Sequence, residues 1–245
     1  MVSVVILDLD NTLWDWADVW VKSFSALLEG IHAATQVDLQ TLKRESREVH
    51  QRRGTTEYSF LLEELPSLQP FLEGTTARVR FDDALHAQNS IRKHQTRLYP
   101  GVLRALTSLK GRGVKLIGYT ESLSFWSEWR IRTTGLDGVI DVLYSAPDHD
   151  FPAGITRKQI RTLKKDDYGL KSTEHRHTPR GALKPDPQVL EQIVAEFGIG
   201  ASGIAYVGDN LSKDIVMAQS VGVYDVHAAY GQAHNRPGYE LLREV

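Results

Sequence analysis

The sequence lacks cysteine, long apolar runs and a strong charge imbalance, and each absence excludes a class of protein. Because none of the 245 residues is cysteine, disulfides, thiolate metal sites and thiol nucleophiles are excluded. No stretch approaches the roughly 18 uncharged apolar residues of a membrane span, so we expect no membrane association. A formal net charge of −2 argues against broad nucleic-acid binding. The apolar start Val4–Leu7 is too short for a signal peptide, and we expect a cytoplasmic protein.

The first apolar run of the chain leads directly into two aspartates. Val4–Leu7 is rich in β-branched residues and predicts a buried strand of a parallel sheet. Because strand side chains alternate, Asp8 and Asp10 start on the same side of the chain. Two carboxylates at the end of a buried strand are costly unless they are paired, hydrogen-bonded or bound to a cation. A single aspartate at such a place often only caps a turn, so the pair alone leaves both interpretations open.

Helical and strand patterns divide the chain into two parts. Between residues 15 and 97 the apolar residues recur at helical spacing, which predicts an all-helical block. From residue 98 onward, helices alternate with short apolar strands, which predicts an α/β domain with a parallel sheet. We therefore expect a doubly wound core of residues 1–14 and 98–245, with the helical block 15–97 inserted as a cap domain. The main expected helices cover residues 17–35, 38–53, 76–97 and 185–197, and the later strands cover 114–119, 139–144, 204–207 and 221–226.

Three polar side chains besides the first aspartates stand where a parallel sheet places a site. Thr120 and Asp209 follow predicted strands, and Lys184 precedes a predicted helix. Ligands of open parallel sheets gather at the carboxyl ends of the strands. Oxygen ligands without histidine or cysteine suit a hard octahedral ion, and Mg²⁺ held by few carboxylates is typical of phosphate substrates. The Thr120 hydroxyl and the Lys184 ammonium could then bind phosphoryl oxygens.

The two aspartates of the first motif can divide the remaining chemistry. One carboxylate can attack phosphorus and form an aspartyl phosphate. The other can protonate the leaving alcohol and then activate water. Asp8 and Asp10 are the candidates for these roles, in an order that their spacing does not decide.

Four motifs together resemble the haloacid dehalogenase-like hydrolase superfamily. They occur in the family's order and in the expected strand or helix contexts. The motifs are Asp8-Leu9-Asp10-Asn11-Thr12, the apolar strand Lys115–Thr120, Lys184-Pro185-Asp186-Pro187, and Gly208-Asp209-Asn210-Leu211-Ser212-Lys213-Asp214. The resemblance covers the core and implies a Rossmann-like domain. The helical block is similar to the family's cap only by position and composition.

The resemblance implies a role for each matching residue. Asp8 would be the nucleophile and Asp10 the general acid and base. Mg²⁺ would be bound by Asp8, by the backbone carbonyl of Asp10 and by Asp209, with Asp214 contributing directly or through water; the alternative for Asp214 is a structural helix cap. Thr120 and Lys184 would bind the phosphoryl group, and Lys184 would also pair with Asp8.

The second aspartate of the first motif also bears on the reaction type. Dehalogenating members of the superfamily lack it and need no metal, so the presence of Asp10 favours phosphoryl transfer. We expect a phosphomonoester hydrolase that acts on a small phosphorylated metabolite. A phosphomutase has the same motifs and is the alternative enzyme. A catalytically silent binding protein of the same fold is the alternative from another class.

The sequence departs from the family pattern beside Thr120 and within residues 146–183. Glu121 follows Thr120 and either belongs to the phosphate-binding group or turns away to cap the next helix, since an inward carboxylate would repel phosphate. The insertion 146–183 is either a basic flap over the site or a solvated surface excursion. Between residues 155 and 183 it has eight basic residues: Arg157, Lys158, Arg161, Lys164, Lys165, Lys171, Arg176 and Arg180.

Three smaller groups of residues have both a functional and a structural interpretation. Arg52 and Arg53, before the turn Gly54-Thr55-Thr56, form either a specificity loop or a charged helix end. Trp14 and Trp16 either line the active-site entrance or pack at the hinge between core and cap. His149, His175 and His177 either bind a second metal or are simply solvated.

Overall fold

The chain folds into two compact units. The computed structural model describes residues 1–152, 154–156, 164, 167–232 and 239–245. The first unit contains residues 1–15 and 96–232 and is called the core unit here. The second contains residues 16–95 and the described C-terminal residues 239–245, and is called the helical unit. In the described part of the chain, no helix is both long enough and apolar enough to cross a membrane.

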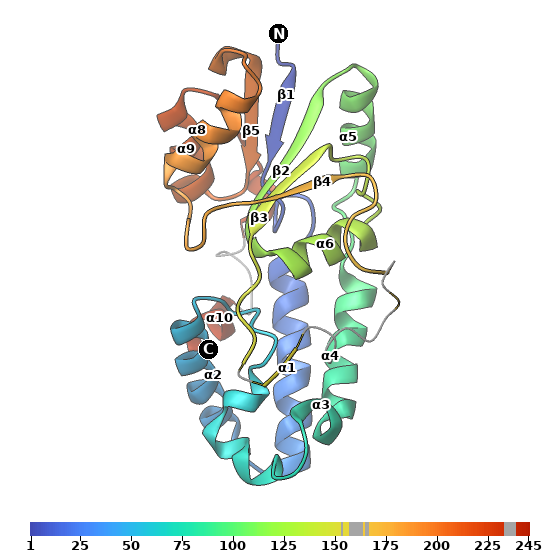
Figure 1. The fold of residues 1–245 in the computed structure, drawn as a ribbon, viewed down its shortest axis with the longest axis vertical. Coiled ribbons are helices and arrows are strands. Elements are labelled where there is room, and N and C mark those ends of the chain that lie inside the picture. Colours follow the sequence, from blue (N-terminus) through green and yellow to red (C-terminus); the bar gives the residue numbers. More distant parts are fainter. Residues whose placement is uncertain (153, 157–163, 165–166, 233–238) are drawn as a thin grey trace. The chain divides into compact units, whose positions relative to one another are not determined.

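The core unit is built on a six-stranded parallel sheet with β1 near its centre (Figure 1). The strand order is β4-β3-β2-β1-β5-β6, and every neighbouring pair is parallel. Parallel order brings the carboxyl ends of all strands to one edge of the sheet, which therefore receives the residues that follow each strand. The strands are β1 (Val4–Leu7), β2 (Lys115–Leu123), β3 (Val142–Ala146), β4 (Glu174–His177), β5 (Ile204–Gly208) and β6 (Tyr224–His227).

Alternation along the strands builds the core on one face of this sheet. Val4 and Ile6 of β1 are buried on the same side as Ile117 of β2 and Ile204 of β5. This face packs against Leu190 of α8 and further residues of α8 and α9. Helices α5 and α6 contact β2 and complete the doubly wound arrangement. The helices of the core unit are α5 (Val102–Gly111), α6 (Ser124–Thr133), α8 (Pro187–Glu196) and α9 (Val216–Val221), with short helical turns at Ala201–Gly203, Leu211–Ile215 and Ala229–Gly231.

The helical unit contains no strand among its described residues, as its apolar spacing predicts. Its long helix α1 packs closely on α4, because Gly30 leaves no side chain to meet Ala84. Helix α2 begins where the Asp38 carboxylate accepts two backbone N–H groups and ends at Gly54, which takes the left-handed conformation. The helices are α1 (Trp16–Thr35), α2 (Leu39–Arg53), α3 (Ala77–Arg80), α4 (Asp82–Gln95) and α10 (Tyr239–Glu244), with 3₁₀ turns at Leu62–Glu64 and Pro66–Phe71.

Three differences between the observed and the predicted elements concern the architecture. The helix predicted over residues 76–97 is two helices, because the chain leaves helical geometry at Phe81. The insertion 146–183 contains strand β4, which pairs with β3 as an additional outer strand of the sheet. Residues 239–245 were predicted in the core, but they pack with the helical unit, where His50 Nδ1 lies 2.7 Å from the carbonyl oxygen of Val245. The first difference is local, whereas the other two depend on partners far away in the sequence.

Candidate active site

Asp8 lies at the carboxyl end of the central strand β1, among the polar residues near the ends of the strands. It follows β1 and is only 7% exposed. Its Oδ1 accepts a hydrogen bond from Lys184 Nζ at 2.6 Å, and its Oδ2 accepts one from Thr12 Oγ1 at 2.7 Å. Thr12 reaches Asp8 because Asn11, with φ of 64°, turns the chain back directly after the strand. Both oxygens of this buried carboxylate therefore have a donor within the protein.

Lys184 is enclosed by acidic and aromatic side chains. Its ammonium also donates to Asp214 Oδ1 at 2.9 Å, and its side chain is 3% exposed. The ring centres of Tyr119 and Tyr206 lie 4.9 Å and 5.6 Å from Nζ, close enough for cation–π attraction. Burial lowers the pKa of Lys184, but Asp214 and Asp8 outweigh it and hold that pKa well above its ordinary value. Lys184 is therefore a charged, immobilised group.

Asp214 is positioned by a close approach that only glycine permits. A Cβ at Gly208 would overlap the Asp214 carboxyl group. The Asp214 Oδ1 also accepts from Tyr206 Oη at 2.9 Å, and its Oδ2 accepts from the backbone N–H of Asn210 at 3.1 Å. Burial raises the pKa of Tyr206 well above its ordinary value, so the phenol keeps its proton and donates. Asp214 is thus held as a partner of Lys184, and the structural cap of the turn Leu211–Ile215 is Asn210.

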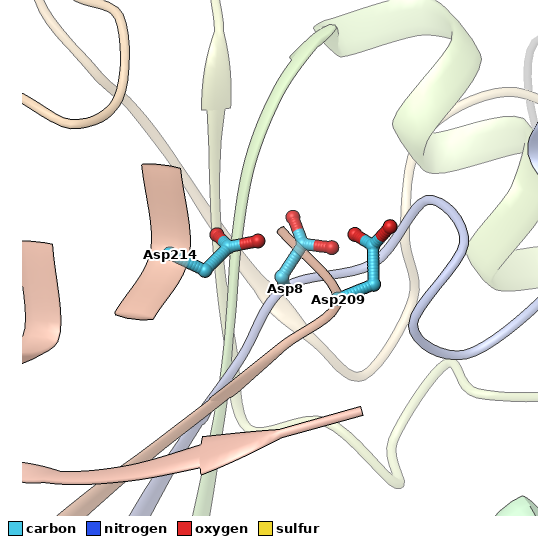
Figure 2. A group of neighbouring side chains, drawn as sticks. All are labelled: Asp8, Asp209 and Asp214. Atoms are coloured by element: carbon cyan, nitrogen blue, oxygen red, sulfur yellow. The ribbon is translucent and has the colours of Figure 1, made fainter. Parts of the chain in front are cut away.

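Three carboxylates meet at this point of the structure. Asp8, Asp209 and Asp214 each offer an oxygen within 4.8 Å of the others, and Figure 2 shows Asp8 between the other two. When all three are ionised they carry three negative charges against the single positive charge of Lys184. Buried like charges at this separation are unfavourable without a compensating cation. Both the oxygen donors and the excess charge therefore fit one divalent hard cation.

Burial and mutual repulsion raise the pKa values of two of these carboxyl groups. Burial raises the pKa of Asp8 to about 8; Asp214 and Asp209 add to the rise, and Lys184 opposes it. Burial raises the pKa of Asp209 to about 7, again with a contribution from Asp214. A cation bound between these carboxylates would favour their ionised forms and reverse the shift.

Asp10 lies beside this cluster and is held by a separate set of donors. Its Oδ1 accepts from the indole N–H of Trp14 at 2.7 Å, and its Oδ2 accepts from Ser122 Oγ at 2.5 Å. Arg130 Nη1, from the buried side chain of α6, lies 3.5 Å from Oδ1. The two aspartates of the first motif therefore have different environments: Asp8 faces Lys184, and Asp10 faces β2 and α6.

Thr120 and Glu121 lie within the C-terminal half of β2, near the same end of the sheet. Thr120 is 3% exposed, and its Oγ1 accepts from the backbone N–H of Ser122 at 3.1 Å. The carboxylate of Glu121 accepts from the backbone N–H of Lys184 and from Lys213 Nζ, each at 2.8 Å. Glu121 does not cap α6 as the structural alternative required, because Asp148 accepts the N–H of Phe125 there. Nor does the geometry support direct phosphate contact, since both Glu121 oxygens already have cationic or N–H partners.

A family comparison agrees with this arrangement. The model of the haloacid dehalogenase-like hydrolases matches residues 2–222. The chain belongs to this family. No curated protein matches the chain.

Solved structures of other family members share the fold of this hydrolase. A haloacid dehalogenase-like family hydrolase from Xanthomonas campestris is 15% identical, with a TM-score of 0.57, over 96% of this chain and 84% of the other. A predicted phosphoglycolate phosphatase from Haemophilus somnus is 16% identical, with a TM-score of 0.52, over 98% and 91%. A Thermotoga maritima protein provisionally assigned as a β-phosphoglucomutase is 20% identical, with a TM-score of 0.52, over 99% and 91%. At these identities the likeness shows the fold alone.

Several other candidate residues of the hydrolase do not join the acidic cluster. Arg52 and Arg53 pair with Glu64 inside the helical unit. Trp14 is buried and bonds to Asp10, and the indole of Trp16 donates to Glu57 in the helical unit.

The histidines of the insertion make no metal group. His175 lies 2.9 Å from Glu128 Oε1 and 2.8 Å from Ser145 Oγ, which fastens β4 to α6 and β3. His149 and His177 do not complete a ligand set with it, because the three aspartates are the only group of potential metal ligands in the described part of the chain.

The basic residues of the insertion are described only in part. Arg176 and Arg180 pair with acidic neighbours, Glu174 and Asp150 respectively. Arg157, Lys158, Arg161 and Lys165 lie outside the described residues. The two interpretations of the insertion, flap or surface excursion, therefore both remain predictions.

Several residues that contact the predicted site were given no role from the sequence, and four of them differ in the signal that was available. Thr12 was part of the first motif, and its place four residues after Asp8 was an available signal. Tyr206 lies on the same strand face as Ile204 and two residues before Gly208, so strand alternation could have pointed to it. Ser122 and Arg130 had no local signal, because their contact with Asp10 spans more than 100 residues of sequence.

Proposed function

We propose that this hydrolase cleaves phosphomonoesters of a small metabolite, with Mg²⁺ as cofactor and an aspartyl phosphate on Asp8 as intermediate. The observation that carries the proposal is the buried group of Asp8, Asp209 and Asp214 around Lys184, whose excess negative charge fits a divalent cation. Asp8, Asp209 and the backbone carbonyl of Asp10 would hold the ion, with Asp214 beside them. When bound, Mg²⁺ would neutralise charge on the phosphoryl oxygens.

In the first half of the reaction, a carboxylate oxygen of Asp8 attacks phosphorus. A new P–O bond forms to Asp8 while the bond from phosphorus to the ester oxygen breaks, and Asp10 gives its proton to the departing alcohol. The Lys184 ammonium and the Thr120 hydroxyl would bind the equatorial oxygens, where charge is spread in the transition state. Lys184 suits this role because its position beside Asp8 is set by two carboxylates.

In the second half, water replaces the enzyme at phosphorus. Asp10, now ionised, accepts a proton from the attacking water, and the P–O bond to Asp8 breaks to release inorganic phosphate. The hydrogen bonds from Trp14 and Ser122 hold the Asp10 carboxyl group in a fixed orientation. The presence of Asp10 supports phosphoryl transfer over dehalogenation, as the family resemblance implies.

Phosphate release from p-nitrophenyl phosphate with Mg²⁺ tests this function. We expect turnover that EDTA abolishes and excess Mg²⁺ restores. We expect Asp8→Asn to lower kcat by about 10³-fold or more, because the amide retains the size of the side chain and lacks its nucleophilic charge. Turnover that survives both EDTA and Asp8→Asn would contradict the proposal.

A panel of phosphorylated metabolites separates the hydrolase from the alternatives. A hydrolase releases phosphate in proportion to substrate consumed. A mutase moves the phosphoryl group between two positions of a sugar with little net release. Binding of phosphate compounds without turnover across the panel would instead indicate the silent binding protein.

A further inference from the structure

Glu121 connects three segments that meet at the proposed active site. Its own segment is the end of β2, directly after Thr120. Its Oε1 accepts from the backbone N–H of Lys184 at 2.8 Å, and its Oε2 accepts from Lys213 Nζ at 2.8 Å. Lys213 directly precedes Asp214, so the second contact reaches the turn that carries the acidic motif. One side chain thus joins the segments of all the proposed phosphate-binding groups.

The contact of Glu121 with the Lys184 main chain also restricts where the Lys184 side chain can lie. The ammonium of Lys184 is held by Asp8 at 2.6 Å and by Asp214 at 2.9 Å, while the main chain of the same residue is held by Glu121. A lysine fixed at both ends has little freedom to move its charge away from Asp8. For a catalytic group, a misplacement of about 1 Å can cost roughly 100-fold in rate.

The contact with Lys213 explains how the Glu121 carboxylate can lie beside a proposed phosphate-binding site. Glu121 would repel a phosphate dianion if its charge were uncompensated. The Lys213 ammonium pairs with it, and their side chains are 43% and 25% exposed respectively. A pair this exposed contributes little to folding stability. The charge of Lys213 is therefore more relevant to substrate binding than to the stability of the fold.

We infer that Glu121 is a positioning residue of the proposed reaction: it anchors the main chain of Lys184, and Lys213 neutralises its charge. This inference rests on the proposed function and assigns a role to the residue at which this chain departs from the family pattern. Glu121 touches no reacting atom. It acts through Lys184, so its removal should change kcat, whereas exposure of its charge should change KM.

The chain offers a matched control at the opposite end of β2. Asp141 accepts the backbone N–H of Leu116 at 2.8 Å through one oxygen and Lys110 Nζ at 3.0 Å through the other. The side chains of Asp141 and Lys110 are 21% and 38% exposed, close to the values for Glu121 and Lys213. Asp141 therefore makes the same two kinds of bond with similar burial, but at the start of the strand and away from the acidic cluster.

The test compares kcat, KM and Tm of Glu121→Ala, Glu121→Gln, Lys213→Met and Asp141→Ala. We expect Glu121→Ala to lower kcat about tenfold or more, and Glu121→Gln to recover most of it, because the amide carbonyl still accepts the Lys184 N–H. We expect Lys213→Met to raise KM several-fold, more at low than at high salt. Adding Glu121→Gln to Lys213→Met should return KM toward the wild-type value. Asp141→Ala should lower Tm as Glu121→Ala does but leave kcat and KM within about twofold.

Two kinetic results would overturn the inference. One is an equal effect of Glu121→Ala and Asp141→Ala on kcat, which would make the role purely structural. The other is a loss in Glu121→Gln as large as in Glu121→Ala. If the wild-type protein hydrolyses no phosphomonoester, the proposed function fails, and crystal structures of the two Glu121 variants then test the inference alone. Lys184 Nζ should leave Asp8 in Glu121→Ala and stay in Glu121→Gln; an unmoved Lys184 in both would overturn it.

Discussion

The core unit and the helical unit each contain a cluster of charged side chains, and the two clusters differ mainly in burial. In the core unit, Lys184 lies between Asp8 and Asp214, and their side chains are 3%, 10% and 3% exposed. In the helical unit, Glu64 lies between Arg52 and Arg53, whose side chains are 55% and 37% exposed. Both are ion-pair networks built from common residues. Only the first has its excess charge shielded from water.

This difference separates a predicted site from a charged helix end. The excess arginine charge of the second cluster is solvated and lies in the last turn of α2, where basic residues interact favourably with the helix dipole. The first cluster is shielded from water, and burial, with a smaller contribution from the neighbouring carboxylates, raises the pKa of Asp8 to about 8. Buried, unbalanced charge is therefore a stronger indication of a ligand than the number of charged residues is.

Lys184→Met should produce the largest effect on stability, because it breaks the buried cluster. The variant leaves Asp8, Asp209 and Asp214 without the positive charge of the Lys184 ammonium. Loss of one partner from a buried ion pair costs about 3–5 kcal/mol. We expect the free energy of unfolding, measured in urea at pH 8 with EDTA, to fall by that amount. We also expect kcat to fall by about 100-fold or more. Unchanged stability would mean that water reaches the cluster and that its charges need no partner inside the protein.

The pH dependence of stability should show an intermediate effect, confined to the core cluster. The folded pKa values of Asp8 and Asp209, about 8 and about 7, lie above the ordinary value of 3.8. The native state then binds more protons than the unfolded state, so stability of the metal-free protein should fall as pH rises from about 4 to 8. Mg²⁺ should reduce this loss by stabilising the ionised carboxylates.

The control for this experiment is Asp209→Asn, because other groups titrate in the same range. His50 has a pKa lowered by burial and therefore contributes stability that increases with pH, in the opposite direction. The difference between the wild-type protein and Asp209→Asn cancels that contribution. A difference that does not change between pH 4 and 8, with or without Mg²⁺, would contradict the assignment of Asp209 to a metal site.

Arg52→Ala and Arg53→Ala should produce the smallest effects. The ion pairs with Glu64 are exposed on the arginine side, and such pairs contribute about 0–1 kcal/mol. We expect changes of that size in the free energy of unfolding and no change in KM for the best substrate. A tenfold rise in KM would instead support the specificity loop that the sequence also allowed, and would make the exposed cluster functional as well.

Elements with a strong local pattern could be predicted, and those without one could not. The apolar spacing of α1 and the caps of α8 identify these helices directly, and the apolar run of β1 identifies the first strand. Strand β4 has the sequence Glu-His-Arg-His, which contains no apolar residue, so nothing local distinguishes it from a loop. It forms a strand because β3 offers an unpaired edge and because His175 bonds to Glu128 and Ser145.

By itself, the sequence determined which residues stand at the carboxyl ends of the strands. Asp8, Thr120 and Asp209 each follow a buried apolar run, and strand geometry is set by such local patterns. Only the tertiary structure decided how these residues are paired. It brought Lys184 to Asp8 across 176 residues and gave Glu121 a partner in the Lys184 main chain. The physical reason is that pairing depends on where loops and helices return the chain, and burial then determines what each charge requires.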